Sequence, residues 1–113
     1  MKAKDIMPRS AANVTADVLL LWQNDYKSVF EINVPKGDGQ EGGYKGWIRK
    51  PNRNEMRELT SKKTDPVTYS EIVLDMLWLG GDEEIKTVDE VFYGAMGVIQ
   101  NVMDIPEASL KKV

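Results

Sequence analysis

The side chains that most often carry out catalysis are missing from this chain of 113 residues. It contains neither histidine nor cysteine, which removes the usual general base at neutral pH, the commonest metal ligand and all thiol chemistry. Catalysis would have to rely on carboxylates, lysines, tyrosines and hydroxyls, and no paired acid–base motif is evident among them. We therefore predict that the protein is not an enzyme, has no catalytic residues and uses no cofactor.

Two polar stretches have residue types that bind ions, but neither has the spacing that ion binding requires. The glycine-rich segment 37–43 lacks the lysine followed by serine or threonine of a phosphate-binding loop, and Asp38 and Glu41 would repel a phosphate. The acidic run 82–84 offers the oxygen ligands that hard cations prefer, but it lacks the spacing of a calcium loop. We expect a hairpin tip in the first stretch and no metal site in the second, whose acids favour the N-terminus of the following helix.

Charge is distributed unevenly along the chain. Residues 45–63 include seven basic residues against two acidic ones, whereas residues 64–90 include eight acidic residues against one basic one. Two solvated faces of opposite sign would explain this pattern, and so would head-to-tail association between copies or a basic surface for an acidic partner. We expect a protein partner, with a homo-oligomer as a further option. The predicted partner-binding residues are Trp47, Arg49, Arg53, Arg57, Asp82, Glu83 and Glu84.

The segment from Tyr44 to Arg53 alternates aromatic and basic side chains. In a strand, Trp47 and Arg49 would face away from Tyr44 and Ile48. Either both faces of the strand are covered, or Trp47 is an exposed anchor for a partner, a role in which tryptophan and arginine are common. An alternative function for this segment is single-stranded nucleic-acid binding, with rings for base stacking and cations for phosphates. Its small extent and the net charge of −3 argue against that alternative.

Hydrophobic periods predict a β-hairpin of strands 29–34 and 44–50, joined by a long glycine-rich loop. Helices near 66–79 and 88–104 should form an antiparallel pair joined by a turn at Gly80–Gly81. The predicted fold class is α+β, with the hairpin packed on about four helices. Helix starts are predicted at Thr15, at Asn52 with Glu55, at Asp65–Pro66, and at Thr87 with Glu90.

The sequence also predicts how the chain is divided. We expect a flexible N-terminal arm at 1–14, a single α+β domain at 15–106 and a polar tail at 107–113. No apolar run is long enough for a secretory signal or a membrane span, so we expect a cytoplasmic protein with no membrane partner. In the last helix, Gly94 and Gly97 would allow either close approach of a neighbouring helix or a self-association seam.

Several segments between residues 22 and 100 occur in an order that is typical of one family. They are Trp22 with Tyr26 ahead of Val29–Ile32, the strand exit Trp47–Arg53, Asp65–Pro66, the run Leu77–Ile85, and Asp89–Phe92. In these features the chain resembles the small tail assembly chaperone-like proteins of tailed bacteriophages.

This resemblance implies a role without catalysis. Such proteins bind the long, apolar tape-measure protein and keep it soluble until the tail tube polymerises around it, and they have no active site. The arm at 1–14 departs from the family pattern and leaves open a role as a minor virion or adaptor protein. The six methionines of the chain supply adaptable side chains that suit irregular apolar partners, although core packing is their more usual use.

Overall fold

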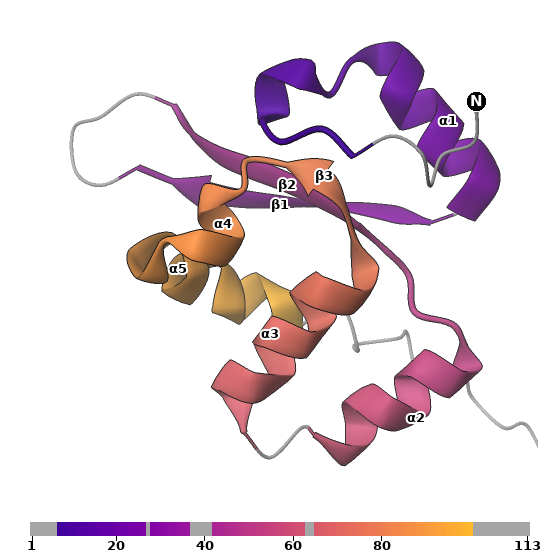
Figure 1. Cartoon of the computed structure of the whole chain (residues 1–113), viewed down its shortest axis with the longest axis vertical. Helices are drawn as coiled ribbons and strands as arrows, with labels where there is room; N and C mark the ends of the chain where they lie inside the picture. Colours follow the sequence, from indigo (N-terminus) through magenta and orange to yellow (C-terminus); the bar gives the residue numbers. More distant parts are fainter. Residues whose placement is uncertain (1–6, 27, 37–41, 63–64, 101–113) are drawn as a thin grey trace, which may run out of the picture.

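The computed structural model of the chain describes residues 7–26, 28–36, 42–62 and 65–100 (Figure 1). In chain order, the described elements are η2 (Ala11–Asn13, a 3₁₀ helix), α1 (Ala16–Tyr26), β1 (Val29–Pro35), β2 (Gly43–Arg49), α2 (Arg53–Ser61), α3 (Pro66–Leu77), β3 (Trp78–Gly81), α4 (Glu84–Thr87) and α5 (Asp89–Ile99).

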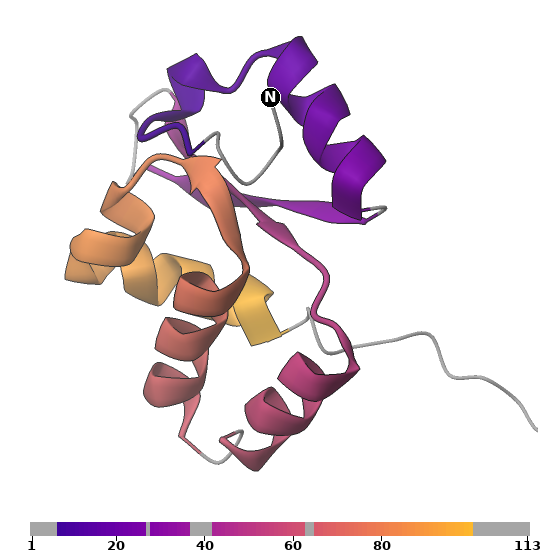
Figure 2. The same cartoon turned by 45° about the vertical axis from the view of Figure 1, so that its right-hand side comes forward.

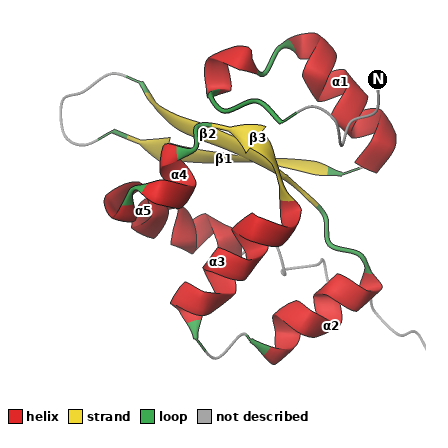
Figure 3. Cartoon of the chain, viewed as in Figure 1, coloured by secondary structure: helices red, strands yellow, loops and turns green. Residues whose placement is uncertain are grey.

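The strands form one antiparallel sheet in the order β1-β2-β3. Figure 3 shows this sheet as a middle layer, with η2 and α1 on one face and α3, α4 and α5 on the other. Helix α2 lies beside α3, at the end of the molecule remote from α1 (Figure 2). The arrangement confirms the predicted α+β class and the pairing of the first two strands.

The third strand corrects the sequence prediction. The helix expected at 66–79 ends at Leu77, and the next four residues form β3, which pairs with β2 with Gly81 opposite Gly46. Gly81 has φ +126°, and a Cβ there would lie 2.5 Å from the carbonyl oxygen of Lys45, so only glycine fits this close strand pairing. The predicted turn at Gly80–Gly81 is therefore wrong: α3 and α5 contact each other, but β3 and α4 connect them.

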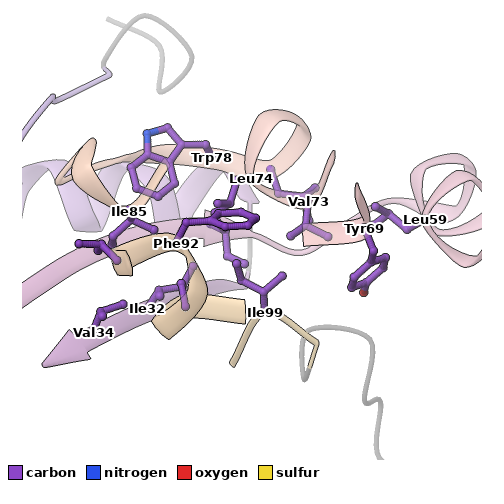
Figure 4. Close-up of a cluster of buried hydrophobic side chains, with 14 residues drawn as sticks. Ile32, Val34, Leu59, Tyr69, Val73, Leu74, Trp78, Ile85, Phe92 and Ile99 are labelled. Carbon is purple, nitrogen blue, oxygen red and sulfur yellow. The ribbon is translucent and has the colours of Figure 1, made fainter. Parts of the chain in front are cut away.

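Two apolar clusters lie on opposite faces of the sheet. The larger one joins the sheet to helices α2–α5, and Figure 4 draws 14 of its side chains, with labels on Ile32 and Val34 from β1 and on Phe92 and Ile99 from α5 among others. The smaller one centres on Trp22, Trp47 and Leu79 under α1. Sheet and helices thus bury apolar surface on both sides, which a lone hairpin could not do.

Most of the predicted helix starts are confirmed. Thr15 accepts a hydrogen bond from the Val18 N–H, Asn52 and Glu55 form the capping box of α2, and Asp65 caps α3. The capping box predicted for α5 is wrong, because Val88 occupies the cap position without a side-chain bond. The Thr87 hydroxyl donates instead to the Glu83 carbonyl, within α4.

The N-terminal segment is bound to the sheet, at least from Pro8 onward. The Gly81 and Glu83 N–H groups donate to the carbonyls of Pro8 and Arg9, at 3.0 and 3.3 Å. The expected flexible arm is therefore wrong for residues 8–14, while residues 1–6 lie outside the described part. The predicted tail at 107–113 and the end of the last helix, 101–104, also lie outside it. Among the described residues, no helix is long and apolar enough to cross a membrane.

The two glycines of α5 have different surroundings. A Cβ on Gly94 would lie 2.8 Å from Cγ1 of Val34, so this glycine allows close packing against strand β1 and not, as expected, against a helix. Gly97 faces open space, since nothing lies within 4 Å of the same position there.

Candidate functional site

Trp47 is a core residue. Its side chain is only 7% exposed and packs against the ring of Trp22, with 6.3 Å between ring centroids and 43° between ring planes. Leu79 of β3 completes the cluster. Of the two options for this residue, the covered strand is right and the exposed anchor is wrong. The strand therefore presents no exposed tryptophan ring on which a nucleic-acid base could stack.

Arg49 joins three elements at the exit from β2. Its two terminal nitrogens donate to both carboxylate oxygens of Glu55 at 2.7 Å, and one of them also donates to the Met76 carbonyl at 3.1 Å. The guanidinium lies 5.9 Å from the ring centroid of Tyr26. The hydrogen bonds to Glu55 raise the pKa of Arg49, and those from Arg49 lower the pKa of Glu55. Arg49 thus fixes α2 and α3 against the sheet.

The other two predicted arginines lie on the exposed surface of α2. Arg57 donates to the side-chain oxygen of Asn54 at 2.8 Å. Neither Arg53 nor Arg57 forms an ion pair with a carboxylate of the described residues. Together with Met56 they border a shallow hollow of about 420 Å³. This hollow is the part of the predicted basic surface that remains accessible.

The acidic turn after β3 connects neighbouring segments of the fold. The Asp82 carboxylate accepts hydrogen bonds from the Ala11 N–H at 2.7 Å and from the Lys45 N–H at 3.0 Å, so it joins the N-terminal segment to β2. Glu83 lies 3.9 Å from Arg9 in an exposed ion pair, and Glu84 begins α4. The seven predicted partner-binding residues are therefore not one surface: the turn lies beside the sheet, and α2 lies at the far end of the molecule (Figure 1).

A groove between α3 and α5 combines apolar and acidic side chains. It encloses about 240 Å³, and Val67, Phe92 and Tyr93 are among the residues that line it. Val67 is 41% and Tyr93 58% exposed, so both apolar side chains are accessible to a partner. Its acidic lining residues are Glu71, Asp75 and Asp89, and Lys86 is its one basic lining residue.

Sequence reasoning missed this groove. Its walls come from two helices that the sequence predicts to pack together. Their relative placement, however, depends on β3 and α4, which connect them. The available signal was local: Tyr93 stands off the apolar stripe of its helix, four residues after Asp89, and Val67 stands four residues before Glu71. This signal is weak, because single exposed apolar residues are common on protein surfaces and only a contiguous patch or groove indicates an interaction site.

No protein-family model, curated protein or solved structure matches the chain. Its function is therefore inferred from the surfaces of the chain itself. Within the described residues, no group of three or more acidic side chains is placed to hold a metal ion.

Proposed function

We propose that this chain is a non-enzymatic protein-binding domain whose main binding surface is the α3–α5 groove. The observation that carries the proposal is the exposure of Val67 and Tyr93 on the two walls of that groove. Exposed aromatic and aliphatic side chains around a concave surface are typical of sites where a partner's apolar residue is buried.

The charge of the groove specifies the partner further. Glu71, Asp75 and Asp89 surround the apolar walls, against the single basic residue Lys86. The Lys86 ammonium lies 5.5 Å from the centroid of the Trp78 ring, where it makes a cation–π contact. A partner segment that presents an apolar side chain next to lysine or arginine would match this surface, and its cation could also lie against the Tyr93 ring.

The resemblance to tail assembly chaperone-like proteins supports a specific form of this proposal. In that role the groove would bind segments of a tape-measure protein and keep them soluble during tail assembly. The helices that form the groove also carry the partly buried methionines Met76 and Met96, whose side chains can adapt to neighbours of different shape.

The experiment is co-expression of the chain with a long tape-measure-like protein encoded next to its gene, with the soluble fraction of that protein as the readout. Tyr93→Ala should reduce the soluble fraction, because it removes the exposed ring of the groove. Leu20→Ala on α1 is the matched control, since Leu20 and Tyr93 are both 58% exposed. Equal soluble fractions with both variants, or no increase in solubility with the unaltered chain, would contradict the proposal.

A further inference from the structure

The two edges of the sheet differ in what covers them. The β3 edge is covered by the N-terminal segment, through the hydrogen bonds to Pro8 and Arg9. Strand β1 forms the other edge, and no described residue pairs with its outer side. It is seven residues long, and its Glu31, Asn33 and Pro35 side chains are exposed. A strand edge of this length is a template for a further strand.

The hydrogen bonds at the ends of β1 show which backbone groups point outward. The Lys36 N–H donates to the Gly42 carbonyl, and the Lys50 N–H donates to the Ser28 carbonyl. Residues 28 and 36 therefore direct their backbone groups toward β2, and alternation assigns 30, 32 and 34 to the same side. The N–H and carbonyl groups of Val29, Glu31 and Asn33 then point away from the sheet. Pro35 has no N–H, so its outward side offers only a carbonyl.

One side of this edge is apolar. Phe30 shares the face of β1 that carries Ile32 and Val34, but it is 41% exposed. Gly94 places one side of α5 against Val34, and Val98, one turn later on that side, is 43% exposed. By helix spacing, Val98 lies on the side of α5 that packs against β1, so it adds an exposed apolar side chain to that face of the sheet. The opposite face of the edge is polar, with Glu31 3.7 Å from Lys45.

We propose that β1 binds an extended segment of a protein partner by strand addition. Alternate residues of the segment would be apolar, directed toward Phe30 and Val98, and the residues between them would be polar, with a basic one beside Glu31. Opposite charges and apolar pairs across neighbouring strands stabilise a sheet in this way, and edge-strand addition is a recurrent mode of peptide recognition.

A second copy of the chain would bring its own α5 to this edge. Helix α5 packs directly against β1, where it keeps Ile32 and Val34 only 3% and 6% exposed (Figure 4). Pairing two β1 strands about a two-fold axis would place both α5 helices on the same side of the joined sheet. Both helices would then have to fit side by side over neighbouring strands about 4.8 Å apart, whereas packed helices need about 8–10 Å between their axes. A segment without a helix of its own avoids this requirement.

The test uses amide hydrogen exchange and a synthetic heptapeptide in which valine alternates with lysine and threonine. In the full chain without peptide, the amides of Glu31 and Asn33 should exchange faster than those of Ile32 and Val34. Saturating peptide should slow exchange at Glu31 and Asn33 about tenfold or more, since their N–H groups gain partners. In an antiparallel pairing the lysine and threonine N–H groups of the peptide point at this edge, so a peptide N-methylated at these residues should not bind.

Two valines of similar exposure provide the matched variants. Val98→Asp beside the edge should weaken peptide binding, while Val67→Asp in the α3–α5 groove should leave it unchanged, the two being 43% and 41% exposed. Equal protection of all four amides in the free chain, equal binding of the methylated peptide, or no binding up to about 1 mM peptide would overturn the proposal. A larger effect from Val67→Asp would assign the peptide to the groove and would overturn it too.

Discussion

Replacement of Trp47 by alanine tests most directly whether this side chain supports the fold or contacts a partner. Trp47 is 7% exposed and packs on Trp22, which is fully buried. Truncation of a buried tryptophan to alanine typically costs about 3–5 kcal/mol through lost burial and the cavity left behind. The lost ring–ring contact contributes about 0.5–1.5 kcal/mol beyond burial, so we expect the upper part of that range.

Urea unfolding followed by far-ultraviolet circular dichroism measures this loss. With a urea m-value of about 2 kcal/mol/M, a loss of about 4 kcal/mol lowers the midpoint by roughly 2 M. Leu20→Ala is the control, because Leu20 is 58% exposed on α1 and its loss should cost about 0.5 kcal/mol or less. Trp47→Phe should fall between the two, since it keeps an aromatic ring in the cluster.

The outcome that would refute the reasoning is specific. If Trp47→Ala lost less than about 1 kcal/mol, similar to the surface control, the ring would not be an essential part of the cluster. If the same variant also weakened the binding of a protein partner, the exposed-anchor interpretation would be correct after all.

Two further variants test the polar contacts. The lowered pKa of Glu55 means that its ionised form is favoured in the folded chain. The free energy of unfolding should therefore decrease as the pH falls below about 4.5, the ordinary pKa of this group, and then through its lowered pKa. Glu55→Gln should remove this part of the acid dependence. It should also cost about 1.5–3 kcal/mol at neutral pH, because the charged hydrogen bonds with Arg49 are lost. An unchanged pH profile of the unfolding free energy would contradict this. Asp82→Ala should leave the Ala11 and Lys45 N–H groups without their acceptor, so their hydrogen exchange should accelerate. The exchange of the Ile48 amide should stay unchanged and is the control. Full protection of the Ala11 and Lys45 amides in this variant would contradict the assigned bonds.

Local sequence signals predicted the elements that depend on neighbouring residues. The capping box of Asn52 and Glu55 and the Asp65–Pro66 start were correct because cap, proline and first-turn contacts span only a few residues. The alternation in 29–34 and 44–50 predicted the hairpin for the same reason. The absence of histidine and cysteine excluded thiol chemistry and histidine catalysis without any structure.

Tertiary structure decided the role of each stretch whose partners are remote in the chain. Gly80–Gly81 matches a helix stop as well as a strand, and only the fit of Gly81 against Lys45 and Gly46 makes it β3. Trp47 is buried because α1, more than twenty residues earlier, covers its face of the sheet. Asp82 resembles its acidic neighbours in sequence, but it holds the N-terminal segment through a contact 71 residues away. The groove exists because β3 and α4 place α3 beside α5. Among the described residues β1 is left as an edge because β3 pairs with the other side of β2, and neither pairing is encoded by a local pattern.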